Sequence, residues 1–230
     1  MKSCYRFGEF EFEGSNSEEL KFLGKEIFDK NCYFVDGLPK NAKILDIGAH
    51  VGLAVGYFKK IAPDSKIIAV EPLSENLVFL RRNVHRNRFE NVEIIEKAVA
   101  KKTGKRTLYA DATDAKWYST GGFIKNAWNG HQKSIGREVD TIQLSSLLSE
   151  KIDLLKIDIE GGEYEVLDEA RASMVIVNKV IVEAHPVGAH SSDKVVKLLK
   201  SVGFETQIDQ VLRGRDVGEK GLVIVNGWRD

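Results

Sequence analysis

Residues 46–52, with the sequence Asp-Ile-Gly-Ala-His-Val-Gly, have the types and spacing of a cofactor-binding turn. They follow an apolar run and precede a helical pattern, so the predicted order is strand, glycine turn, helix. A dinucleotide site has the spacing G-x-G-x-x-G, whereas here three residues separate Gly48 from Gly52. The Asp46 carboxylate would repel a pyrophosphate and attract the ammonium or sulfonium of S-adenosylmethionine. The turn therefore favours methyl transfer over nicotinamide chemistry.

A second cofactor signal follows at Glu71. Residues 66–70 have the pattern of a buried strand that ends at Glu71-Pro72, and Glu71 falls nineteen residues after Gly52. At about this distance in Rossmann-like units a carboxylate accepts hydrogen bonds from ribose hydroxyls. Leu73 is expected to lie against the adenine. We predict that S-adenosylmethionine is bound by Asp46, Gly48, Ala49, His50, Gly52, Glu71 and Leu73.

Further polar residues follow two later strand patterns. Asp158 and Glu160 come directly after an apolar run and are expected on one face, because strand side chains alternate. Glu183 and His185 repeat this spacing after the next strand pattern. Ligands bind at the carboxyl edge of open α/β sheets, so these groups are expected beside the cofactor. Glu163 is predicted in the first turn of a helix, where the helix dipole by itself favours a negatively charged side chain.

Two chemical interpretations of this cluster remain open. Methylation of a hydroxyl needs a base, and His185 supported by Glu183 or Glu160 would supply one. Alternatively, Asp158, Glu160 or Glu183 with His185 would hold a divalent cation that polarises the acceptor oxygen. We favour the base and expect no metal, because carboxylate clusters without a complete ligand set usually bind substrate.

The elements that must position these residues alternate between strand and helix from residue 42 onward, which predicts an open parallel sheet. Predicted strands are 43–47, 66–70, 92–97, 153–158, 179–184, 203–209 and 221–226. Predicted helices are 52–62, 74–87, 143–149, 162–171 and 192–201. A polar stretch joins the last two strands, which favours a hairpin. The predicted fold class is α/β, Rossmann-like, with a seven-stranded, mostly parallel sheet and a C-terminal antiparallel hairpin, as in class I methyltransferases.

Two segments lie outside this alternation. Residues 1–41 are expected to form an extension that packs on the main domain, residues 42–230, with a strand at 8–12 and a helix from Asn16 or Ser17 to about Lys30. In the second segment, 105–110 and 135–142 are predicted to pair as strands. The insert between them, 110–135, contains Trp117, Tyr118 and Trp128 among glycines, so it is either a lid over a substrate or a surface loop.

Net charge, apolar run length and cysteine content disfavour several classes of function. The 230 residues contain 34 Lys+Arg and 34 Asp+Glu, so no net charge draws in nucleic acid. No apolar run approaches the roughly 20 residues that span a bilayer, and the first ten residues lack a signal-peptide core. Two cysteines make neither a disulfide framework nor a metal site. We expect a cytoplasmic protein that acts on a small molecule or glycan, without a nucleic-acid or membrane partner, and the oligomeric state is left open.

Taken together, these motifs resemble the FkbM family of S-adenosylmethionine-dependent methyltransferases over residues 44–205. The resemblance rests on residues 46–52, on Glu71-Pro72, on 98–104, on Lys-Ile-Asp-Ile-Glu-Gly-Gly-Glu at 156–163, and on Glu-Ala-His at 183–185. It implies O-methylation of hydroxyls on sugars, polyketides or other small or glycan-like acceptors. It also implies that Gly48, Glu71, the backbone of Lys97 and Ala98, and Asp158 surround the cofactor.

The sequence departs from this family at His50, where asparagine is more usual, and at Gly162, where alanine is common. Alternatives to small-molecule O-methylation also remain. A methyltransferase acting on amino groups of nucleic acid or protein would show Asn/Asp-Pro-Pro-Tyr/Phe after the fourth strand, and residues 158–161 occupy that place instead. An RNA methyltransferase of another type is weakened by the zero net charge. A catalytically silent module of the same fold is the strongest rival, since fold does not imply function.

Overall fold

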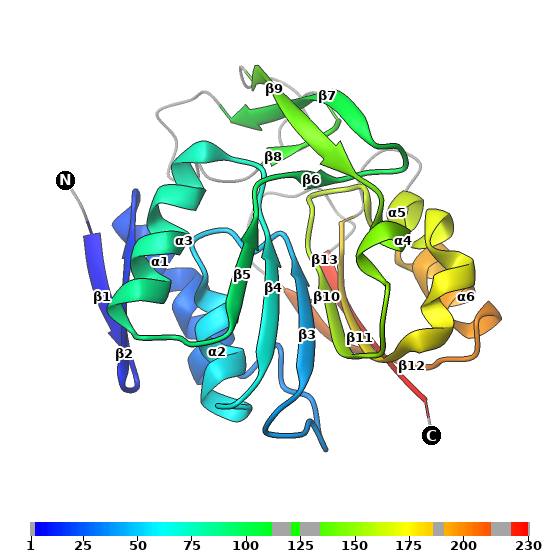
Figure 1. The fold of residues 1–230 in the computed structure, drawn as a ribbon, viewed down its shortest axis with the longest axis horizontal. Helices are drawn as coiled ribbons and strands as arrows, with labels where there is room; N and C mark the ends of the chain where they lie inside the picture. Colours follow the sequence, from blue (N-terminus) through cyan, green and yellow to red (C-terminus); the bar gives the residue numbers. More distant parts are fainter. Residues whose placement is uncertain (1–2, 112–120, 125–133, 186–190, 213–221, 230) are drawn as a thin grey trace.

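The computed structural model describes residues 3–111, 121–124, 134–185, 191–212 and 222–229. Its centre is a seven-stranded sheet in the order β12-β13-β11-β10-β3-β4-β5 (Figure 1). All strands are parallel except β13, which runs antiparallel to both neighbours. The predicted sheet with its C-terminal hairpin is confirmed. The strands are β3 (Lys43–Ile47), β4 (Lys66–Val70), β5 (Val92–Ile95), β10 (Ile152–Ile157), β11 (Val177–Ala184), β12 (Glu205–Leu212) and β13 (Leu222–Trp228).

Helices cover both faces of this sheet (Figure 1). On one face lie α2 (Leu53–Ile61) and α3 (Ser74–Arg86); on the other lie α4 (Leu144–Leu147), α5 (Glu163–Glu169), α6 (Ser192–Ser201) and the 3-10 helix Arg171–Ile176. Successive β3 residues serve opposite faces, with Ile44 in the core beneath α2 and Leu45 in the core beneath α5 and α6. No helix in the described ranges is long and apolar enough to cross a membrane.

The N-terminal segment packs on the α2–α3 face. It consists of β1 (Ser3–Phe7), β2 (Phe10–Gly14), α1 (Ser17–Gly24) and the π-helix Lys25–Asp29. The strand predicted over 8–12 overlaps β2 at residues 10–12, but Gly8, with φ +60°, lies in the turn of a hairpin whose first strand, β1, was not predicted. Asn16 caps α1, and its side chain accepts from the Glu18 and Glu19 amides. Phe12 and Phe28 enter the same core as Tyr57 of α2.

A separate four-stranded sheet, in the order β6-β9-β7-β8, lies across the top of the central sheet in Figure 1. It consists of β6 (Ala98–Val99), β7 (Gly104–Asp111), β8 (Gly121–Gly122) and β9 (Ser134–Ile142). The predicted pairing of 105–110 with 135–142 is confirmed, with Lys105 opposite Asp140. Most of the predicted 110–135 insert, including Trp117, Tyr118 and Trp128, lies outside the described residues.

Candidate active site

The glycine turn after β3 presents closely packed backbone at the end of the strand. Gly48 has φ +80° and Gly52 φ +91°, the left-handed region that glycine occupies without steric penalty. A Cβ atom on Gly48 would lie 1.8 Å from the carbonyl oxygen of Asp158, so no side chain fits there. The amides of Gly48 and Ala49 donate to the Val70 carbonyl at 2.9 and 3.0 Å. Position 48 must therefore be glycine, because the Asp158 backbone packs directly against it.

Glu71 lies beside this turn and is 5% exposed. Its Oε1 accepts from the Leu73 amide at 3.0 Å and from Asn76 Nδ2 at 3.1 Å, and its Oε2 accepts from the His50 amide at 2.9 Å. Burial raises the pKa of the Glu71 carboxyl, and His50 opposes that shift. Because a carboxylate offers about four acceptor positions, these three donors leave capacity for a ligand hydroxyl.

Lys156 is a buried cation at the centre of the strand edge. Its Nζ lies 3.1 Å from Asp46 Oδ1 and 3.6 Å from Asp158 Oδ2, and it donates to the Gly48 carbonyl at 2.8 Å. Burial alone would lower the pKa of Lys156, but Asp46 and Asp158 raise it above its usual value. The Asp46 carboxylate therefore faces Lys156, and its predicted contact with the cofactor stays a prediction.

His185 lies between carboxylates and is 3% exposed. Its Nδ1 is 2.9 Å from Glu163 Oε1, and its Nε2 is 3.2 Å from Glu160 Oε2 and 4.0 Å from Asp158 Oδ1. Burial opposes protonation, yet the surrounding carboxylates, Glu160 first, raise the pKa of His185 well above its usual value. An imidazole in this setting is a cation at neutral pH.

Glu183 reaches the same cluster from the end of β11. Tyr33, in the segment after the π-helix, donates from its hydroxyl to Glu183 Oε2 at 2.7 Å. Burial, and then the neighbouring Asp158 carboxylate, raise the pKa of Glu183 to about 7, against the opposing effects of His185, Tyr33 and Lys156. Glu183 is thus a carboxyl group that can exchange a proton near neutral pH.

Asp158 and Glu160 meet at His185 by a route different from the predicted one. β10 ends at Ile157, so strand alternation does not extend to either carboxylate. Glu160 instead has φ +62° and Gly161 φ +105°, a left-handed turn that aims Glu160 back towards the imidazole. The residues come together as predicted, but a turn, not a strand face, joins them.

Three residues of this cluster were not selected from the sequence as site residues. Glu163 was explained by the helix dipole; it does begin α5, but it is 2% exposed and bonded to His185 and to the Gly161 amide. Lys156 offered a signal, since a lysine that follows two leucines in a buried strand pattern needs a buried partner. Tyr33 offered none, because its partner Glu183 is 150 residues away along the chain.

The remaining predicted cofactor residues surround the glycine turn. Leu73, at the start of α3, is 5% exposed, and its Cδ1 would lie 3.3 Å from a Cβ on Gly121 of β8. Ala98 begins β6 and pairs with β9, directly after Lys97. His50, with φ +52°, places its Nε2 4.0 Å from Glu19 Oε1 of α1. Cofactor contacts of these residues stay predictions.

The metal interpretation has partial geometric support. Asp158, Glu183 and His185 each offer one potential ligand atom, and these atoms lie within 4.8 Å of one another. However, the Lys156 ammonium already lies 3.6 Å from Asp158 Oδ2, and both ring nitrogens of His185 already face carboxylates, Glu163 at 2.9 Å and Glu160 at 3.2 Å. Because these side chains already have partners within the cluster, we assign no metal to it.

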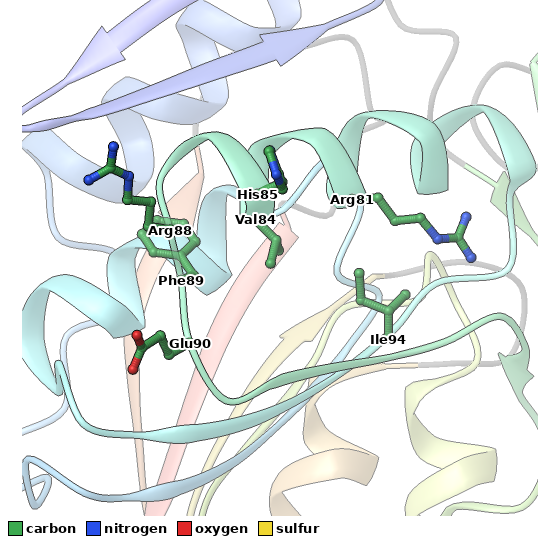
Figure 2. A pocket seen from close by; sticks show the side chains of 7 residues that line it. All are labelled: Arg81, Val84, His85, Arg88, Phe89, Glu90 and Ile94. Atoms are coloured by element: carbon green, nitrogen blue, oxygen red, sulfur yellow. The ribbon is translucent and has the colours of Figure 1, made fainter.

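A hollow lies between α3 and β5 (Figure 2). Figure 2 shows its lining: the apolar side chains of Val84, Phe89 and Ile94, with Arg81, His85, Arg88 and Glu90. Arg81 is paired with Glu96. None of the predicted site residues lines this groove, so we do not include it in the active site.

Comparison with known proteins places the chain among methyltransferases. Residues 46–206 match the family described as methyltransferase FkbM domain. Methyltransferase sdnD of Sordaria araneosa is 30% identical over 229 residues, covering 84% of this chain and 85% of that protein. The 31-O-demethyl-FK506 methyltransferase FkbM of Streptomyces tacrolimicus is 28% identical over 224 residues, with 85% of each covered. The crystal structure of methyltransferase FkbM from Methylobacillus flagellatus KT has the same fold, with TM-score 0.55 and 16% identity over 85% of this chain and 46% of that one.

Proposed function

The chain belongs to the FkbM methyltransferase family and uses S-adenosylmethionine as methyl donor, and from this premise we propose the acceptor class and the base. The acceptor is a hydroxyl oxygen on a small molecule, a sugar or a glycan-like compound, and Glu183 takes its proton. The Streptomyces relative supports an oxygen acceptor, since its name is that of a 31-O-demethyl-FK506 methyltransferase.

The residues around the glycine turn fit the cofactor. Glu71 has spare acceptor capacity for a ribose hydroxyl, and Asp158 packs directly against the turn at Gly48. S-adenosylmethionine supplies an electrophilic methyl group on its sulfonium. The protein therefore has to align an acceptor oxygen with that methyl and to remove one proton, and alignment is the larger contribution.

The observation that carries this proposal is the partly exposed Glu183 carboxyl beside Asp158, the residue that packs against Gly48. Burial and the Asp158 carboxylate raise the pKa of Glu183 to about 7. An aliphatic hydroxyl is a poor nucleophile until its proton leaves, and a base poised near neutral pH suits that task. The acceptor oxygen forms a bond to the methyl carbon, the electron pair of the broken C–S bond stays on sulfur, and the hydroxyl proton passes to Glu183. Charge balances, because the sulfonium becomes a neutral thioether as the carboxylate becomes a carboxylic acid.

His185 receives a different role in this proposal from the one expected of it. A base must be unprotonated before the reaction, and the carboxylates of Glu160 and Glu163 keep the imidazole charged. We assign His185 to holding these carboxylates in place, and Glu160 and Glu163 to orienting its ring. The base is then the neighbouring carboxylate, Glu183.

The experiment compares wild type with Glu183→Gln on a panel of monosaccharides, phenols and aliphatic alcohols, with labelled S-adenosylmethionine as donor. We expect an O-methyl product and a Glu183→Gln turnover lower by about 10²- to 10⁴-fold, with unchanged cofactor affinity. Wild-type turnover should rise with pH through about 7 and then level, because Glu183 acts unprotonated. A rise only at alkaline pH would favour His185 as the base, and methylation of amines or RNA alone would refute the acceptor class.

A further inference from the structure

Tyr33 comes from a part of the chain that lies before the family-matched residues 46–206. It is 4% exposed, and its hydroxyl donates to Glu183 Oε2 at 2.7 Å. The pKa of the Tyr33 phenol is raised well above its usual value by burial and by Glu183, so the hydroxyl keeps its proton. The phenol is therefore a constant donor to the Glu183 carboxyl, whatever the protonation state of that group.

The segment that carries Tyr33 is held at both ends. Asn31, with φ +53°, begins a turn in which the Phe34 amide donates to its carbonyl at 2.9 Å. The Tyr57 hydroxyl of α2 donates to Asn31 Oδ1 at 3.2 Å. At the other end, Lys179 Nζ of β11 donates to the Asp36 carbonyl at 2.8 Å. Helix α2 and strand β11 thus both anchor the segment.

The Tyr33 ring is fixed as well as its hydroxyl. It packs against Phe58 of α2, with ring centroids 6.3 Å apart, and Lys156 Nζ lies 5.5 Å from the centroid of the Tyr33 ring. A phenol held in this way costs little additional entropy to keep in place, because its two side-chain torsions are already restricted. The hydrogen bond to Glu183 is therefore preorganised.

We propose that Tyr33 is a positioning residue for methyl transfer: it fixes Oε2 of Glu183, so that Oε1 faces the acceptor hydroxyl. The inference rests on the proposed function only in its use of Glu183 as the base. It makes residues 31–36 part of the active site, although they precede the matched family region. The groups that act on Glu183 from the surrounding elements are Tyr33, Cys32, Lys156, Asp158, Glu160 and His185.

The test compares Tyr33→Phe with Tyr5→Phe, using NMR titration of isotope-labelled glutamate carboxyls. Glu183→Gln identifies the Glu183 resonance by its disappearance. Tyr5 of β1 packs against the core that contains Tyr33, whereas Tyr33 is the tyrosine whose hydroxyl donates to Glu183. Loss of a donor to the ionised carboxylate should raise the Glu183 midpoint by about one pH unit in Tyr33→Phe. In Tyr5→Phe the midpoint should stay at the wild-type value.

Turnover then links the contact to catalysis. With an acceptor from the hydroxyl panel, Tyr33→Phe should lower kcat about 10-fold and move the acid limb of the pH profile upward by the same shift, with unchanged affinity for S-adenosylmethionine. An unshifted Glu183 midpoint in folded Tyr33→Phe would overturn the inference. Full turnover in Glu183→Gln would instead overturn the proposed base, which is a separate result because the NMR titration needs no acceptor.

Discussion

Replacing Lys156 by Met removes the buried cation that joins the glycine turn to the carboxylate edge. Lys156 is 2% exposed, and its side chain faces Asp46, which is fully buried, at 3.1 Å. Met has a similar length and no charge, so the variant keeps most of the packing. It leaves Asp46 buried without its ion-pair partner and the Gly48 carbonyl without the Lys156 donor.

We expect the Lys156→Met substitution to lower the free energy of unfolding by about 3–5 kcal/mol at pH 8, the usual cost of removing one partner from a buried pair. The loss should shrink in mild acid. Burial raises the pKa of Asp46, and Lys156 lowers it. Without Lys156, the pKa of Asp46 in the folded chain therefore lies further above its value in the unfolded chain. Between those two pKa values the folded chain binds an additional proton, and stability falls as pH rises through that window.

Urea denaturation at pH 8 and pH 5.5 measures the effect, with an unchanged m-value required for the comparison. Lys105→Met is the matched control, because Lys105 pairs with Glu138 on the surface and such pairs contribute little. The double variant Lys156→Met/Asp46→Asn should recover most of the loss, since it leaves no buried charge without a partner. A loss below about 1 kcal/mol at both pH values, or no recovery in the double variant, would refute this electrostatic account.

Two further predictions concern the cofactor side of the site. Gly48→Ala should destabilise the fold by about 2–5 kcal/mol, from left-handed strain and from collision with the Asp158 carbonyl, as measured by urea denaturation. Gly203→Ala, with φ +90° and open space around its Cβ, should show only the strain, and equal losses would contradict the collision. Glu71→Ala should weaken S-adenosylmethionine binding about 10- to 150-fold in a calorimetric titration, because it removes charged hydrogen-bond acceptors. The exposed Glu75→Ala should bind normally, and tight binding by Glu71→Ala would rule out the ribose contact.

The central sheet was predictable because buried parallel strands are nearly continuous apolar runs. Residues 43–47 and 66–70 were predicted with the bounds that the structure shows for β3 and β4. The N-terminal hairpin was not, because Ser3–Phe7 mixes polar and apolar residues without a clear period. The alternation of polar and apolar residues across 8–12 predicted a strand that includes Gly8. The turn at Gly8 was missed, because its conformation depends on the pairing of β1 with β2.

The sequence predicted which residues meet at the site better than it predicted their protonation states. Asp158, Glu160, Glu183 and His185 were expected together because the ends of neighbouring strands meet at one edge. The charge state of His185 could not be predicted, since it depends on contacts with Glu160 and Glu163 that arise only in the folded chain. Tyr33 illustrates the same limit, because no local pattern indicates a partner on a distant strand.

Calorimetric titration of the wild-type protein with S-adenosylmethionine and, separately, with NAD tests the central claim most directly. Both titrations are made first with EDTA and then with magnesium. We expect S-adenosylmethionine to bind at one site per chain, magnesium to leave this binding unchanged, and NAD not to bind. Binding of NAD, or no binding of S-adenosylmethionine, would contradict the assignment of the Gly48 turn and Glu71. Tighter binding with magnesium would contradict the metal-free site.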